Sequence, residues 1–204
     1  MKNYLCIDGK RIELTEDQIA EITKSVITAP VKLSDKAVGD TFKIGEYEFI
    51  ALEHDRSKGT TAAILKGLIG TSPFSDSDCD FKTSRVKAEL EAFADKISSV
   101  IGTDNLITHT VDLTANDGLK CYGKTTAKMS LLTADLYRQY VEILDNFNPD
   151  EWWWLSTPYS TSKHGYTQYV LCVSPRGLVV NGNYDYDYYG VRPFCILNSN
   201  IFVS

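Results

Sequence analysis

The sequence predicts an α+β fold, with a main domain over residues 36–204 and a small appendage over residues 1–30. Several short segments alternate apolar and polar residues, which is the pattern of half-buried strands. Two longer segments, residues 84–100 and 133–144, carry apolar residues at helical spacing. The helices do not alternate regularly with the strands, so a mixed sheet is expected rather than a βαβ series.

The appendage is expected to be a β-hairpin followed by one helix. Residues 4–7 and 11–14 read as strands around an Asp8-Gly9 turn, and Thr15 and Gln18 fit a capping box that starts the helix. A hairpin and one short helix bury too little surface to fold alone. We therefore expect the appendage to dock on the rest of the chain or on another chain, which makes an oligomer a possible outcome.

The first half of the main domain is expected to hold strands and one long helix. Residues 38–52 predict two paired strands around Gly45, residues 61–68 a third strand, and residues 105–113 a fourth. The intervening residues 70–82 are rich in Ser, Asp and Gly and predict a loop. The helix carries its apolar face at steps of three and four residues: Val86, Leu90, Phe93, Ile97 and Val100.

The second half begins with a helix and then becomes β-rich. Thr133 is the expected N-cap of that helix, which continues to Leu144. The strands expected after it are residues 152–155, a hairpin of 166–173 and 178–180, then 191–197 and a closing strand at 201–203.

Composition excludes several classes of partner and site. The chain has 204 residues, a net charge of -6 and no basic stripe, which argues against binding the phosphate backbone of nucleic acids. It has no apolar run of the length that spans a membrane and no leader-like N-terminus, so we expect synthesis in the cytoplasm. Association with a virion after lysis would leave no mark in the sequence. The five scattered cysteines predict free thiols.

Motifs for catalysis or metal binding are missing from the sequence, so a non-enzyme is expected, without a cofactor. An enzyme using His164 or Cys172 is the least supported alternative. Residues 75–80 resemble a calcium loop but lack its Gly and its distal Glu. A second calcium alternative would use Asn181, Asn183, Asp185 and Asp187.

Two aromatic features stand out near the C-terminus. Trp152, Trp153 and Trp154 are consecutive, and on a strand the first and third share a face. Residues 181–190 read N-G-N-Y-D-Y-D-Y-Y-G, the composition of an antibody-like binding surface, although tyrosines packed on a sheet edge are an equal interpretation. The predicted ligand-binding residues are Tyr159, His164, Asn181, Asn183, Tyr184, Asp185, Tyr186, Asp187, Tyr188 and Tyr189.

Residues 152–158 (W-W-W-L-S-T-P) and 190–194 (G-V-R-P-F) resemble the end motifs of an uncharacterised bacterial and phage domain family with the signature WWLRSP … GVRP. Residues 39–45 (G-D-T-F-K-I-G) and 84–90 (S-R-V-K-A-E-L) are similar to its opening strand and first helix. The resemblance covers residues 36–197. Here Ser-Thr-Pro stands where the family often has Arg-Ser-Pro.

The resemblance implies a C-type-lectin-like fold, a mixed sheet with two main helices. That fold is distantly similar to formylglycine-generating enzymes and to the receptor-binding proteins that phage retroelements diversify. It implies structural roles for Trp152, Trp154 and Arg192 and places the loop before G-V-R-P at a ligand-binding face. No established activity comes with the family.

These observations together predict a non-catalytic ligand-binding module, encoded by a phage or prophage, that binds a protein or a glycan through the loop before G-V-R-P. The alternative is an intracellular phage interaction protein that inhibits a host defence enzyme. An enzyme on a scaffold like that of formylglycine-generating enzymes is a third, weaker possibility.

Overall fold

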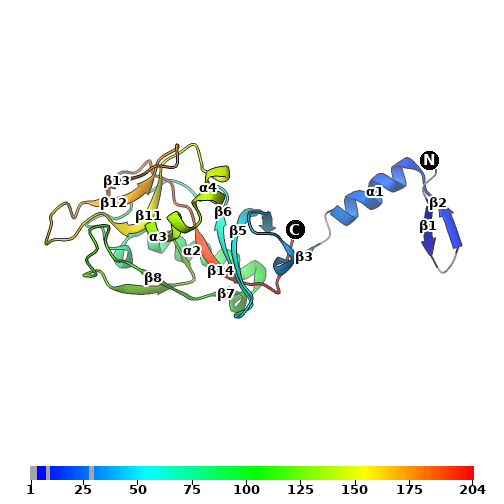
Figure 1. Ribbon diagram of the computed structural model, residues 1–204, viewed down its shortest axis with the longest axis horizontal. Helices are drawn as coiled ribbons and strands as arrows, with labels where there is room; N and C mark the ends of the chain where they lie inside the picture. The colour runs from blue at the N-terminus through cyan, green and yellow to red at the C-terminus, as the bar shows by residue number, and fades with distance from the viewer. Residues whose placement is uncertain (1–3, 8–9, 28–29) are drawn as a thin grey trace.

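A computed structural model of the chain describes residues 4–7, 10–27 and 30–204, and in these ranges it shows an α+β fold of antiparallel sheets and helices (Figure 1). The described α-helices are α1 (Glu16–Ile27), α2 (Arg85–Ile101), α3 (Ala134–Gln139) and α4 (Val141–Leu144). Short 3-10 helices span Leu33–Asp35, Phe81–Thr83, Thr103–Asn105 and Asp145–Phe147.

Two sheets form the centre of the main domain. The larger sheet has the strand order β10-β14-β6-β5-β4, and β7 also pairs with β14. Its strands are β4 (Thr41–Ile44), β5 (Tyr47–Asp55), β6 (Thr60–Leu65), β7 (Leu106–Ile107), β10 (Met129–Ser130) and β14 (Phe194–Asn198). The smaller sheet has the order β11-β12-β13, with strands β11 (Trp153–Pro158), β12 (Tyr169–Val173) and β13 (Val179–Asn183).

Three two-stranded pairs complete the sheets that the structure describes. They are β1 (Tyr4–Ile7) with β2 (Lys10–Glu13), β3 (Val31–Lys32) with β15 (Phe202–Val203), and β8 (His109–Asp112) with β9 (Lys124–Ala127). The strand expected at residues 201–203 therefore does not close the main sheet, because it pairs with the short strand β3.

The appendage has the predicted hairpin and helix. Thr15 and Gln18 form the capping box, since the Gln18 amide donates to the Thr15 hydroxyl (3.2 Å) and the Thr15 amide donates to the Gln18 side chain (3.0 Å). The expected Asp8-Gly9 turn lies outside the described residues. In Figure 1, β1, β2 and α1 stand apart from the remaining elements.

Both helices of the main domain form, with two differences from the prediction. Ser84 caps α2, and four of the five predicted apolar positions are buried, but Val100 in the last turn is 56% exposed. The second helix is capped by Thr133 as expected, yet it breaks at Tyr140 into α3 and α4. At the break, the Tyr140 side chain is buried.

The predicted strand at residues 105–113 is divided at Thr108. Its first part, β7, pairs with β14 in the main sheet, whereas its second part, β8, pairs with β9. The chain thus leaves one sheet and enters another within three residues. The polar segment that forms β9 reads K-T-T-A and has no apolar alternation, which is why the sequence does not predict it.

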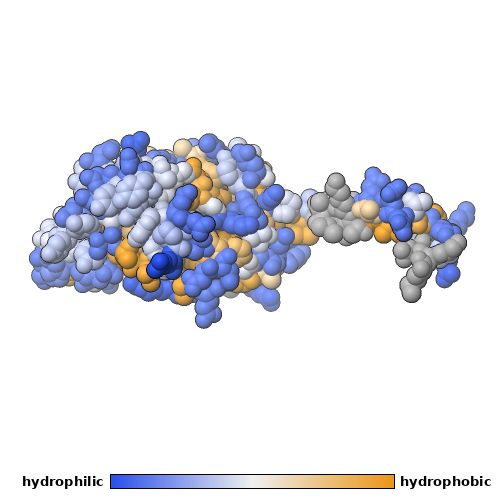
Figure 2. All heavy atoms as spheres, turned by 90° about the horizontal axis from the view of Figure 1, so that it is seen from above, coloured by the Kyte–Doolittle hydropathy of each residue, from blue (hydrophilic) through white to orange (hydrophobic). Residues whose placement is uncertain are grey.

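Two hydrophobic cores lie on opposite sides of the sheets. The α2 core contains the buried face of α2 with Ala51, Ala63 and Trp154, and the α3 core contains α3 and α4 with Ile50, Trp153 and other buried residues. Neighbouring residues along β5 and β11 therefore enter different cores, as strand alternation requires. We use the names α2 core and α3 core below. Hydrophilic residues cover most of the face of the main domain seen in Figure 2.

Arg192 is fully buried in the main domain. Its Nε donates to the Leu65 carbonyl (2.9 Å), and its Nη2 donates to the carbonyls of Lys66 (3.1 Å) and Phe147 (2.8 Å). The guanidinium also lies over the Trp153 ring, 5.0 Å from its centroid. Burial lowers the pKa of Arg192 to about 10, so the side chain stays protonated at neutral pH.

We predict that Arg192→Met lowers the free energy of unfolding by about 3 kcal/mol or more, because each buried carbonyl left without a donor costs about 1–3 kcal/mol. Urea unfolding measures the loss. The matched control is Arg176→Met, at an exposed position, which we expect to change stability by less than about 0.5 kcal/mol. Equal losses in the two variants would contradict the role given to Arg192.

Candidate ligand-binding site

The loop of residues 184–189 is held at both ends by the segment 72–75. The Phe74 amide donates to the Tyr184 carbonyl (2.8 Å), and the Ser72 amide donates to the Tyr189 carbonyl (3.0 Å). After the loop, Gly190 donates to the Trp152 carbonyl (2.7 Å) and accepts from the Trp154 amide (3.0 Å). These bonds attach the tyrosine-rich loop firmly to β11.

Tyrosine side chains of this loop form an aromatic cluster with one buried and two exposed members. Tyr189 is only 5% exposed and stacks on Trp152, with ring centroids 5.6 Å apart and planes at 9°. Tyr186 and Tyr188 are 37% and 57% exposed and stack on each other at 5.3 Å and 22°. Tyr189 meets both rings edge-on, at 5.5 Å and 4.9 Å. We call Tyr186, Tyr188 and Tyr189 the tyrosine platform.

A glycine beneath the platform is required by its packing. A Cβ added at Gly182 would lie 2.5 Å from a ring carbon of Tyr189 and 3.2 Å from the Trp154 ring. No real side chain tolerates the shorter distance, so Tyr189 can occupy its position only above a glycine. The close approach fixes the ring on which the exposed tyrosines rest.

The structure revises the expected loop at residues 181–189. Asn181 and Asn183 belong to β13, and they alternate with Val180 and Gly182, so their side chains point to the α3-core side. Tyr189 belongs to the α2 core and is not free to touch a ligand, and Tyr184 is half-buried. Of the predicted set in this segment, the exposed side chains are Asn181, Asp185, Tyr186, Asp187 and Tyr188.

Tyr159 and the tyrosine platform lie on different faces of the molecule. It packs against the α3 core, whereas Tyr189 belongs to the α2 core on the other side of the β11-β12-β13 sheet. Tyr159 instead contacts Tyr166 and Tyr169 edge-on, at centroid distances of 6.5 Å and 6.2 Å. Tyr166 is 64% exposed and has a left-handed φ of 61°, an uncommon conformation for a bulky residue.

His164 lies in the exposed loop that precedes β12. Its Nδ1 is 3.0 Å from Asp117 Oδ2, which also accepts hydrogen bonds from Ser160 and Thr161. Burial acts to raise the pKa of Asp117, but these bonds and one from the Leu119 amide outweigh it and lower the pKa to about 2. Asp117 thus connects the turn at residues 116–118 to the loop, and His164 is one of its partners.

Cys172, the predicted alternative nucleophile, is fully buried in the α2 core. Its thiol donates to the Val180 carbonyl at 3.6 Å. Burial raises the pKa of Cys172 to about 12, although the Tyr189 hydroxyl acts in the opposite direction. The thiol therefore stays protonated at neutral pH, and an enzyme that uses Cys172 as its nucleophile has no support in this structure.

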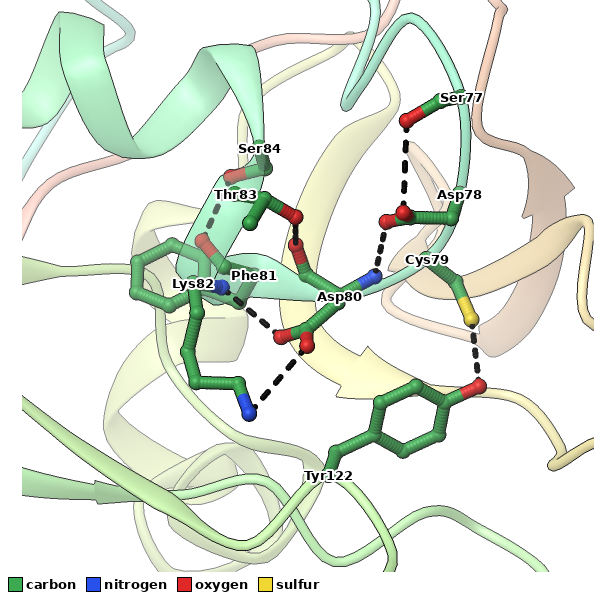
Figure 3. A network of polar contacts seen from close by, with 9 residues as sticks. All are labelled: Ser77, Asp78, Cys79, Asp80, Phe81, Lys82, Thr83, Ser84 and Tyr122. Carbon is green, nitrogen blue, oxygen red and sulfur yellow. Dashed lines mark hydrogen bonds and ion pairs between the residues drawn. The ribbon is translucent and has the colours of Figure 1, made fainter.

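The acidic loop at residues 75–80 uses its carboxylates to build its own turns (Figure 3). Asp78 accepts hydrogen bonds from the Asp80 amide (2.9 Å) and the Ser77 hydroxyl (3.3 Å). Asp80 accepts from the Lys82 amide (3.0 Å) and pairs with its ammonium (3.3 Å). Within residues 4–7, 10–27 and 30–204, no group of three or more His, Cys, Asp or Glu side chains is arranged to hold a metal ion.

Comparisons with protein families, with curated proteins and with solved structures each found no match to this chain. Among the residues that the structure describes, no helix has the length and apolar character needed to cross a membrane.

Thiol accessibility gives the first test of this arrangement. Cys6 and Cys121 are exposed, whereas Cys79, Cys172 and Cys195 are buried. We expect iodoacetamide at pH 8 to alkylate the two exposed thiols rapidly in the folded protein and all five in urea, because burial suppresses both access and thiolate formation. Peptide mass spectrometry assigns each site. Rapid native labelling of Cys172 would contradict its placement under the tyrosine platform.

Gly182→Ala tests the support of the platform. We expect it to lower the free energy of unfolding by about 1–3 kcal/mol, because the added methyl group displaces the Tyr189 ring. Near-ultraviolet circular dichroism should report the altered packing of the tyrosines and tryptophans. The control is Gly67→Ala, where nothing lies within 4 Å of the added Cβ and φ, as at Gly182, is outside the left-handed region. That control separates the effect of replacing a glycine by alanine from the loss of ring packing.

Proposed function

We propose that this chain is a non-catalytic binding module and that Tyr186 and Tyr188 form the centre of its contact surface. The observation that carries this proposal is the stacked, exposed tyrosine pair held edge-on by the buried Tyr189. Large aromatic side chains that are already ordered lose little conformational entropy on binding. Their hydroxyl groups add hydrogen bonds to the apolar area of the rings.

The charges beside the platform favour a protein partner with basic groups. Asp185 and Asp187 are exposed on either side of Tyr186, and the chain carries a net charge of -6. Opposite charges at the rim of an interface speed association and select the partner. A glycan that stacks on the tyrosine rings is the second class of ligand, which the experiment below separates from the first.

We further infer a C-type-lectin-like architecture for the main domain. Its support is the resemblance at residues 152–158 and 190–194, together with the burial of Trp153, Trp154 and Arg192. The loop that the resemblance associates with ligand binding is the loop that presents the tyrosine platform. The assignment of the chain to a phage or prophage rests on the resemblance alone.

The test compares two matched double variants as immobilised bait. Tyr186→Ala with Tyr188→Ala removes the exposed part of the platform, and Tyr166→Ala with Tyr169→Ala removes two tyrosines from the opposite face. We expect the first pair to weaken binding to the captured partner by about 30-fold, as for interface residues worth about 2 kcal/mol, and to leave the melting temperature nearly unchanged. The second pair should retain binding.

Bacterial lysate and a glycan array serve as the two sources of ligand, each with and without calcium. Capture of a protein that depends on Tyr186 and Tyr188 supports the proposed class, and glycan binding with the same dependence assigns the second class. Binding that survives the first double variant, or that is lost equally in both, would refute the platform as the contact surface.

A further inference from the structure

A cavity of about 440 Å³ opens on the α3-core side of the main sheet, beyond the part that α3 and α4 cover. Its floor is apolar and comes from three neighbouring strands, with Ala62 on β6, Ile107 on β7, and Phe194 and Ile196 on β14. Leu136 and Tyr140 line it from the helical side. The volume is in the range of small-molecule sites. It shares no lining residue with the tyrosine platform.

An irregularity in β5 turns a carboxylate toward this cavity. Ala51 pairs with Ala63, but the next residue of β6, Ala62, pairs with Glu53 instead of Leu52. Because residues directly opposite share a face, Glu53 lies on the same face as Ala62. Regular alternation would send Glu53 to the α2-core face that Ala51 occupies. Such bulges commonly re-aim a side chain at functional sites.

The Glu53 carboxylate is held in position by two residues at the junction of α3 and α4. Its Oε2 accepts hydrogen bonds from the Tyr140 hydroxyl (2.6 Å) and from Gln139 (3.1 Å). In the part of the chain that the structure describes, no Lys or Arg forms an ion pair with Glu53. Lys58 also lines the cavity, and its ammonium is paired with Asp55 at 2.8 Å. The cavity therefore presents an oriented negative charge that is available to a cation.

His109 forms a wall of the cavity without adding positive charge. Its Nε2 is 2.9 Å from the Ser130 hydroxyl, and its ring meets Phe194 edge-on at 5.4 Å. Burial lowers the pKa of His109 to about 4, although the backbone carbonyl of Ile107 acts in the opposite direction. At neutral pH the imidazole is uncharged, so it does not repel a bound cation.

We propose that this cavity is a binding site for a small organic ammonium compound, whose charged group pairs with Glu53 and whose apolar body lies on Ala62, Ile107 and Ile196. The complementarity has two parts, a carboxylate at the mouth and an apolar floor beside it. A charge-assisted hydrogen bond to an oriented carboxylate is stronger than a neutral one, so the ammonium group should dominate selectivity. This proposal does not rest on the proposed function.

The experiment titrates the full chain with 2-phenylethylammonium and follows backbone amides by NMR. We expect shifts concentrated at residues 53–62 and 194–196 and saturation in the millimolar range or below. The neutral analogue 2-phenylethanol should bind at least about tenfold more weakly, because it cannot form the ion pair. Absence of shifts at these strands up to 10 mM, or equal affinity for the alcohol, would overturn the proposal.

Three variants test the assignment of the charge. Glu53→Gln should weaken 2-phenylethylammonium binding at least about tenfold. Tyr140→Phe keeps the carboxylate but removes its positioning hydrogen bond, and we expect a loss of about threefold. Glu48→Gln is the matched control, since Glu48 lies on the same strand but pairs with Lys66 outside the cavity, and it should have no effect. Equal losses for Glu53→Gln and Glu48→Gln would refute the site.

A lysine side chain of a protein partner carries the same chemistry. Nα-acetyl-lysine N-methylamide, which keeps the side-chain ammonium group, is therefore titrated in parallel. Tighter binding of this compound than of 2-phenylethylammonium would overturn the assignment to a free small molecule. Tyr186→Ala with Tyr188→Ala should leave both titrations unchanged, which keeps failure of this site distinguishable from failure of the tyrosine platform.

Discussion

The guanidinium of Arg192 joins three parts of the main domain that share no strand pairing with one another. It donates to two carbonyls at the C-terminal end of β6 and to one in the 3-10 helix that follows α4, and it lies over the Trp153 ring of β11. A flat group with several donors suits this task, because a single side chain can satisfy separate carbonyls while stacking on an aromatic face. The buried guanidinium therefore fixes the position of the two sheets and of the segment after α4 relative to one another.

The position of the tyrosine loop follows from that arrangement. Gly190 lies two residues before Arg192 and is hydrogen-bonded to the chain at Trp152 and Trp154, so the end of the loop is placed by β11. Two adjacent tryptophans make different contacts. The Trp153 ring packs against the Arg192 guanidinium on the α3-core side, and the Trp154 ring packs against Tyr189 in the α2 core. The exposed Tyr186 and Tyr188 are positioned through Tyr189 by β11, the strand whose Trp153 also contacts Arg192.

Sequence patterns predict the elements whose stability is local. The capping box at Thr15, the apolar face of α2 and the hairpin of β12 and β13 all depend on residues close in the chain. The division at Thr108 and the pairing of β3 with β15 depend on distant partners, so no local pattern marks them. At the candidate site, composition indicated the tyrosine-rich segment but could not separate the buried Tyr189 from the exposed Tyr188. Glu53 carries no signal in the sequence, because its orientation arises from a bulge.

The pairing of β3 with β15 brings the segment that leads into the main domain beside the C-terminal strand of that domain. Val31 and Val203 are partners, and Figure 1 shows the C-terminus beside β3, on the side away from β12 and β13. Attachment of this domain to another structure, through β3 or through the C-terminus, would therefore leave the same face of the domain pointing away from the attachment point. Display on a particle, a fusion partner or a larger assembly would leave the sheet of β11, β12 and β13 facing the surroundings, whichever end carries the attachment.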